Sequence, residues 1–121
     1  MKSFEYFKID LIVDRKKEEN MSGTLYFIQP AELVGTNRYK IGCSATNDMI
    51  RCKSYRVGTR YIMILECHQP FVVESVVKHR FELIFRRVAG KEYFEGDEHE
   101  MRRLFYETYL ICTMGRTEME L

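Results

Sequence analysis

The stretch GTLYFIQPAELVGTNRYKIGCSAT, residues Gly23–Thr46, gives the clearest indication of the fold in this sequence of 121 residues. Apolar and polar side chains alternate in TLYFIQ around Tyr26 and in RYKIGC around Lys40, which is typical of strands. Pro30 ends the first strand, because a proline nitrogen cannot donate a hydrogen bond to a sheet ladder. The stretch therefore predicts two antiparallel strands that carry a phenol and an amine at interior positions.

The two predicted strands each present two faces, because successive side chains point to opposite sides. Tyr26 and Lys40 are predicted to project from the same face. If Ile28 pairs with Arg38, then Tyr26 lies directly opposite Lys40, at about 5 Å. An ordinary tyrosine–lysine pair on a solvated face is the simpler interpretation of this arrangement. The residues predicted to pack under helices on the other face are Leu25, Phe27, Tyr39 and Ile41.

Downstream of these strands the sequence predicts a short helix, a third strand and two longer helices. Asn47 and Asp48 are expected to open the short helix, which ends near Tyr55. The third strand is expected at 60–67. The order strand, strand, helix, strand, helix, helix predicts a small α/β (α+β) domain, with a mainly antiparallel three-stranded sheet flanked by helices.

After residue 70 the apolar residues follow a helical period, and the helix is expected to end at Gly90. Two pairs at i,i+4 spacing are expected on its outer surface, Glu74 with Lys78 and Glu82 with Arg86. The residues predicted on its apolar face are Val73, Val77, Phe81, Ile84 and Val88.

The last predicted helix begins near Asp97, which forms a capping-box pattern with Glu100. Behind this cap the predicted core positions are Met101, Leu104, Phe105 and Thr108. The length predicts one domain, which we assign to residues 22–110. Residues 1–21 form an N-terminal extension with a short strand or edge extension and a polar joint, and residues 111–121 form a C-terminal tail.

The net charge of +1 conceals an uneven distribution along the chain. Residues 36–91 hold 11 basic against 4 acidic residues, whereas residues 92–121 hold 3 against 8. A basic segment suits a polyanion, because lysine and arginine that neutralise phosphates release counterions. A solvated surface of mixed charge is the alternative interpretation.

The cysteine pattern and the absence of a long apolar stretch indicate the cellular compartment in which the protein is expected. The four cysteines have neither metal-like spacing nor a regular disulfide framework. No stretch is apolar for long enough to cross a bilayer, and charges interrupt the N-terminal apolar run. We therefore expect an intracellular, non-secreted protein without membrane association. The thiols expected to be free are Cys43, Cys52, Cys67 and Cys112.

Four ordered features resemble the GIY-YIG nuclease family, in the compact form found in phages and large DNA viruses. TLY, ending at Tyr26, corresponds to the first motif, and KIG, beginning at Lys40, to the second. Arg51 lies nine residues after Gly42, and KEYF contains Glu92 where the family places its metal-binding glutamate. The resemblance covers residues 22–109. It implies a GIY-YIG-like fold and a nuclease of viral or phage type.

The resemblance also implies a mechanism, namely hydrolysis of DNA with a single metal ion that leaves a 5′-phosphate and a 3′-hydroxyl. Glu92 is expected to hold one Mg²⁺ or Mn²⁺, with water and phosphate oxygens as further ligands. Arg51 is expected to bind the scissile phosphate. Either Tyr26 or Lys40 would take the proton from water. Tyr26 is favoured, because a neighbouring cation lowers the pKa of a phenol.

Four further residues are expected to contact nucleic acid, although surface positions without such a role are the alternative. They are Tyr55, Arg56, Arg60 and His79. No separate DNA-binding domain is recognised, so specificity is expected from loops, from a homodimer or from a partner chain; otherwise cutting is non-specific.

Three positions depart from the family pattern and leave other functions open. Thr24 stands where glycine is usual, Lys40 where tyrosine is usual, and Cys43 where many relatives have a basic residue. One alternative is a nucleic-acid-binding module of the same fold that has lost efficient cutting. Another is an interaction domain that binds no nucleic acid.

Overall fold

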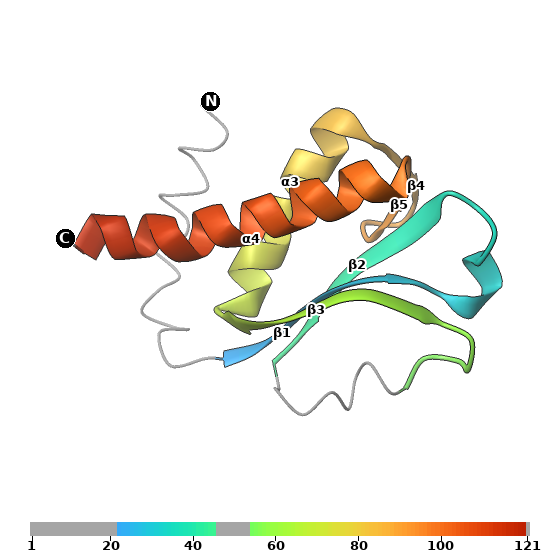
Figure 1. The fold of residues 1–121 in the computed structure, drawn as a ribbon, viewed down its shortest axis with the longest axis horizontal. Coiled ribbons are helices and arrows are strands. Elements are labelled where there is room, and N and C mark those ends of the chain that lie inside the picture. Colours follow the sequence, from blue (N-terminus) through green and yellow to red (C-terminus); the bar gives the residue numbers. More distant parts are fainter. Residues whose placement is uncertain (1–21, 46–53, 121) are drawn as a thin grey trace.

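The computed structural model describes residues 22–45 and 54–120, without the side chains of residues 115–120. Five strands form one antiparallel sheet in the order β3-β1-β2-β5-β4, and two helices cover one of its faces (Figure 1). The strands are β1 (Ser22–Gln29), β2 (Arg38–Ser44), β3 (Arg60–His68), β4 (Arg86–Ala89) and β5 (Tyr93–Glu95). The helices are α3 (Pro70–Ile84), α4 (Glu98–Glu120) and a 3-10 turn, η1 (Ala31–Leu33).

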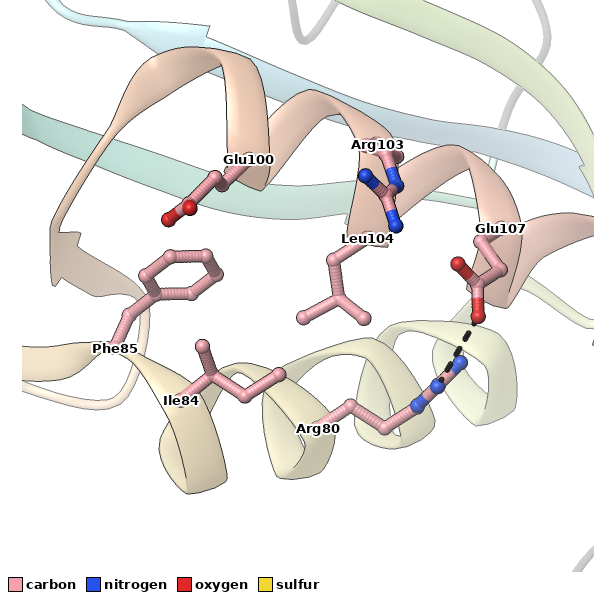
Figure 2. Close-up of a pocket in the computed structure, with 7 residues that line it drawn as sticks. All are labelled: Arg80, Ile84, Phe85, Glu100, Arg103, Leu104 and Glu107. Carbon is pink, nitrogen blue, oxygen red and sulfur yellow. Dashed lines mark hydrogen bonds and ion pairs between the residues drawn. The ribbon is translucent and has the colours of Figure 1, made fainter.

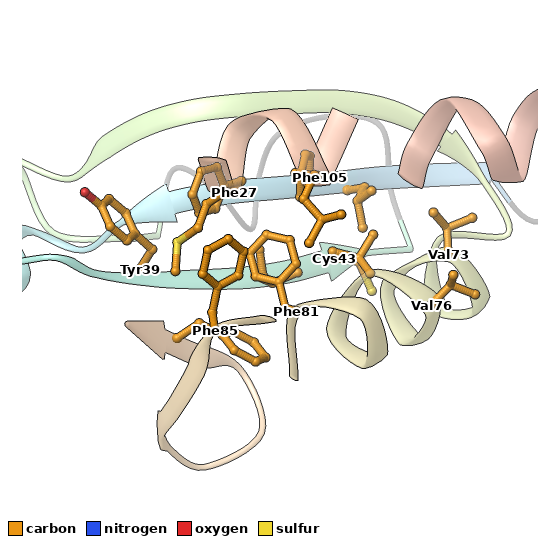
Figure 3. Close-up of a cluster of buried hydrophobic side chains, with 14 of the residues drawn as sticks. Phe27, Tyr39, Cys43, Val73, Val76, Phe81, Phe85 and Phe105 are labelled. Carbon is orange, nitrogen blue, oxygen red and sulfur yellow. The ribbon is translucent and has the colours of Figure 1, made fainter. Parts of the chain in front are cut away.

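The main core lies between the sheet and the two helices (Figure 3). Phe27 of β1 is fully buried, with its ring centroid 6.2 Å from Phe81 of α3 and 5.6 Å from Phe105 of α4. Burying large aromatic rings in this way is a dominant favourable term in folding. All four residues predicted to face the helices belong to this cluster, which confirms the assignment of the strand faces: Leu25, Phe27, Tyr39 and Ile41.

The α+β class is confirmed, but the predicted three-stranded sheet is wrong, because a β4–β5 hairpin adds two strands beside β2. The helix that was expected to reach Gly90 ends at Ile84, whose side chain is 63% exposed. Val88 lies in β4 and not on a helix. The KEYF segment, which was expected to connect two helices, contributes β5.

The chain leaves α3 at Phe85, which is where the sequence-based expectation fails. The backbone of Phe85 is extended, and its buried ring packs 5.1 Å from the ring of Phe81. This turn directs the following residues into pairing with β5. Arg87 then reaches back to Glu82 at 2.8 Å, so the predicted pair of Glu82 with Arg86 is wrong.

The start of α4 confirms the predicted cap. The Asp97 carboxylate accepts a hydrogen bond from the Glu100 backbone N–H at 2.9 Å, which satisfies one donor of the first helical turn. The four core positions predicted behind this cap are all buried. The helix continues to Glu120, through the range assigned to a tail, and Cys112 belongs to the core.

A polar network joins three strands to the start of α4 on the helix-covered side of the sheet. The Arg60 guanidinium donates to both carboxylate oxygens of Glu98, at 2.7 and 2.9 Å, and to Gln29 Oε1 at 2.7 Å. The Tyr39 hydroxyl donates to Glu98 at 3.0 Å. The hydrogen bond from Arg60 lowers the pKa of Glu98, so this carboxylate stays ionised at neutral pH.

Several predicted features lie outside the described residues: the N-terminal extension 1–21, the helix start at 47–48, and Cys52. Ser54 and Tyr55, at the predicted end of that helix, form a turn and a bend. Cys43, Cys67 and Cys112 are buried and form no disulfide in the part of the chain that the structure describes. Within the described ranges, neither helix combines the length and apolarity that crossing a membrane requires.

Candidate functional site

The candidate site begins where the Tyr26 ring crosses Gly42, on the face of the sheet opposite the helices. The two residues are paired in the β1–β2 ladder, and Tyr26 is only 1% exposed. A Cβ added to Gly42 would lie 2.4–2.5 Å from the ring carbons and the hydroxyl oxygen. The glycine of the KIG motif is therefore required by the tyrosine of the TLY motif.

The observed register differs from the one considered in the sequence analysis. Lys40 pairs with Ile28, not with Tyr26, so Tyr26 and Lys40 are diagonal neighbours on one face. The predicted shared face is correct, and the predicted direct opposition is wrong. The physical reason is that Gly42 leaves room for a ring, whereas a lysine stem opposite Tyr26 would occupy that space.

Tyr55 joins the two predicted residues into one hydrogen-bonded cluster. The hydroxyl oxygens of Tyr26 and Tyr55 lie 3.0 Å apart, and either hydroxyl can donate. Lys40 Nζ donates to the Tyr55 hydroxyl at 2.8 Å and lies 4.8 Å from the centroid of the Tyr55 ring. The sequence had indicated Tyr55 only as a nucleic-acid contact. Its role as a bridge could not be predicted, because it depends on contacts between segments that are far apart in the sequence.

Lys40 is held in its charged form. Burial lowers the pKa of its ammonium group, but the hydrogen bond to Tyr55 and attraction to Tyr55, Tyr93 and Glu92 outweigh burial and raise it. A protonated amine has no lone pair with which to accept a proton. Lys40 in this form is therefore the weaker of the two candidates for the base.

Glu92 lies beside β2, within reach of Lys40 on the face opposite the helices and of Lys78 on α3. Its backbone oxygen accepts a hydrogen bond from the Ile41 N–H at 2.9 Å, which fixes its position along the strand. One carboxylate oxygen lies 3.5 Å from Lys40 Nζ, and the other lies 3.7 Å from Lys78 Nζ. The side chain is 40% exposed, so Glu92 faces the cluster and solvent and not the core.

Lys78 is a site residue that the sequence analysis missed. Its predicted ion pair with Glu74 is confirmed at 3.3 Å, but the predicted outer location is wrong, because both side chains are more than 80% buried. Burial, and then the nearby Glu74 carboxylate, raise the pKa of the Cys43 thiol. The buried valines on either side of this pair, Val73 and Val77, were the available signal.

Glu92 is the candidate metal ligand. Among the residues that the structure describes, no three His, Cys, Asp or Glu side chains form a group that could hold a metal ion. A single half-exposed carboxylate still fits Mg²⁺ or Mn²⁺, since such ions keep several waters and accept phosphate oxygens. Both lysine contacts of Glu92 are longer than a charge-assisted hydrogen bond, so a cation can compete for the carboxylate.

Four other residues were predicted to belong to the site, namely Arg51, Arg56, Arg60 and His79. Arg51 lies outside the described residues, so its role as phosphate ligand stays a prediction. Arg56 is exposed in the loop before β3. Arg60 is engaged with Glu98 on the helix-covered side and does not join the Tyr26 cluster. His79 is half-buried on α3, directly after Lys78.

A separate pocket lies between α3 and α4 (Figure 2). Ile84 and Leu104 point toward one another within it, and the ion pair of Arg80 with Glu107 lies at one end. None of its lining residues belongs to the Tyr26 cluster. This pocket and the Tyr26 cluster are therefore two separate places on the molecule.

Comparison with known proteins adds no assignment to this site. No family model matches the sequence, and neither a curated protein nor a solved structure matches the chain. The chemistry is therefore inferred from the distances, burial and charges of the residues themselves.

The contact of Tyr26 with Gly42 makes a prediction about stability. Gly42→Ala is expected to cost about 1–3 kcal/mol of unfolding free energy, because the new methyl group overlaps the Tyr26 ring. Denaturant unfolding of the single and double variants should show that this cost disappears with Tyr26→Ala and persists with Tyr26→Phe. Equal costs in all three backgrounds would contradict the contact.

Proposed function

We propose that the protein is a metal-dependent endonuclease with a GIY-YIG-like nuclease fold, which hydrolyses DNA phosphodiester bonds to 5′-phosphate and 3′-hydroxyl ends. The observation that best supports this proposal is one continuous chain of contacts. It runs from Tyr26 to Tyr55 at 3.0 Å, to Lys40 at 2.8 Å and to Glu92 at 3.5 Å. A proton acceptor, a cation and a carboxylate ligand are thus neighbours, as hydrolysis of a phosphodiester requires.

The charged groups have separate roles in this proposal. A Mg²⁺ or Mn²⁺ held by Glu92 would supply Lewis acidity toward the phosphate and the leaving oxygen. Lys40, kept as a cation, stabilises the negative charge that develops on the phosphate. Arg51 is assigned to the same phosphate, because its planar guanidinium matches phosphate oxygens.

The phenols provide a route for the proton of the attacking water. Tyr26 is 1% exposed, whereas Tyr55 is half-buried and lies between Tyr26 and Lys40. We assign Tyr26, as the phenolate, to the role of base. The water gives its proton to the Tyr55 oxygen while Tyr55 gives its own proton to Tyr26. The Lys40 ammonium donates to the Tyr55 hydroxyl at 2.8 Å, so it fixes the position of the oxygen that receives the proton.

The first test of this function is metal-dependent cutting of plasmid DNA. Glu92→Gln is expected to reduce nicking with Mg²⁺ or Mn²⁺ by about 10²- to 10³-fold, because it removes the metal ligand. Glu95→Gln is the matched control. Glu95 is on β5, and its ion pairs are with Arg38 and Arg86 and not with Lys40, so the variant should retain cutting.

The same assay separates the competing functions. Full activity of Glu92→Gln would contradict the assigned site. No cutting with either metal, together with DNA binding that weakens as salt rises, would favour a binding module of the same fold. No binding to DNA or RNA at low salt would favour an interaction domain.

A second test concerns the role of Lys40. Lys40→Arg is expected to retain several-fold more cutting than Lys40→Met, because arginine supplies a cation but does not give up its proton near neutral pH. Single-turnover rates of the two variants at saturating DNA give the comparison. Equal loss in both variants would indicate that Lys40 acts as the base after all.

A further inference from the structure

Two lysines from different parts of the fold share the carboxylate of Glu92. Lys40 reaches it from β2 at 3.5 Å, and Lys78 reaches it from α3 at 3.7 Å. Both lysine side chains are more than 80% buried, whereas Glu92 is 40% exposed. The most exposed group of this trio is therefore the anion, and its two counter-charges are partly accessible, at 13% for Lys40 and 17% for Lys78.

Each lysine has a second partner that keeps it near the site when Glu92 changes partners. Lys40 donates to the Tyr55 hydroxyl at 2.8 Å, and Lys78 pairs with Glu74 at 3.3 Å. A divalent cation that binds Glu92 would thus meet two ammonium groups that remain close by. Like charges at this range repel strongly in a partly buried environment. A phosphate that arrives with the metal offers both lysines a replacement anion.

We propose that Lys78 binds substrate phosphate and thereby couples metal binding at Glu92 to nucleic-acid binding. Without nucleic acid, Lys78 and Lys40 neutralise Glu92 and weaken its affinity for a metal ion. When a phosphate binds, it takes over the two ammonium groups, and Glu92 becomes available to the metal. The two ligands must strengthen one another equally, because coupling between binding sites is reciprocal. This inference rests on the proposed function.

The test is the affinity for Mn²⁺, measured by the EPR signal of free Mn²⁺ with and without a phosphorothioate oligonucleotide that resists hydrolysis. Without oligonucleotide, Lys78→Met should bind Mn²⁺ about 5-fold tighter than the wild type, because one repelling charge is gone. The oligonucleotide should tighten Mn²⁺ binding by at least about 5-fold in the wild type, and by less in Lys78→Met.

Two further variants control the experiment. Arg87→Met removes one positive charge from the pair with Glu82 on the helix-covered side, and should leave Mn²⁺ affinity unchanged. The double variant Glu74→Gln/Lys78→Met avoids a buried unpaired carboxylate, so it tests the same point if Lys78→Met does not fold.

The outcomes separate this inference from the function on which it rests. If the wild type cuts DNA and binds Mn²⁺, but Lys78→Met binds Mn²⁺ no more tightly, the role of Lys78 is wrong and the nuclease assignment stands. A tightening by Arg87→Met equal to that by Lys78→Met would also overturn it, since net charge alone would explain the effect. If the wild type neither cuts nor binds Mn²⁺, the proposed function fails together with the inference.

Discussion

The packing of the Tyr26 ring over Gly42 is the constraint on which the candidate site depends. Because no side chain stands at this position of β2, the phenol lies across the strand and is almost completely buried. Its hydroxyl group then lies 3.0 Å from that of Tyr55, which also accepts a hydrogen bond from Lys40. A larger residue in place of Gly42 would displace the ring and separate these three groups.

The β4–β5 hairpin supplies the second requirement, which is the position of the carboxylate. By pairing with β2 it extends the sheet, and the Ile41 N–H holds the backbone of Glu92 just before β5. At this place, side chains from both sides of the sheet reach the same group, Lys40 from one side and Lys78 from the other. Two short sequence features thus define the charge environment of Glu92. They are the i,i+4 pair of Glu74 with Lys78 on α3 and the three-residue strand β5.

Sequence alternation was enough to predict which residues of the first two strands face the helices, and that Tyr26 and Lys40 share the other face. It was not enough for β4 and β5, which have four and three residues and depend on pairing with a neighbour more than on intrinsic preference. Val88 continued the helical period of the preceding apolar residues, but the helix ends at Ile84, and the next residue, Phe85, is extended and buried.

Two parts of the site could not be predicted from the sequence, because they also depend on contacts with a distant segment. The Tyr55 bridge and the contact of Lys78 with Glu92 join segments separated by 29 and 14 residues, and no local pattern encodes them. Arg60 illustrates the opposite error. A basic residue beside a glycine loop suggested a nucleic-acid contact, but the guanidinium forms two hydrogen bonds with Glu98 on the other side of the sheet. For Arg60, the charge in the sequence showed neither the face of the sheet nor the partner.

In the proposed site, Tyr26, Tyr55, Lys40 and Glu92 surround one phosphate and one metal ion. A crystal structure with Mn²⁺ and a phosphorothioate oligonucleotide tests it most directly, because the anomalous signal of manganese locates the ion without assumptions. We expect a manganese peak on the Glu92 carboxylate, with a phosphate oxygen beside it and the same phosphate in contact with Lys40. A manganese or phosphate site elsewhere, with Glu92 still bound by Lys40 and Lys78, would contradict it.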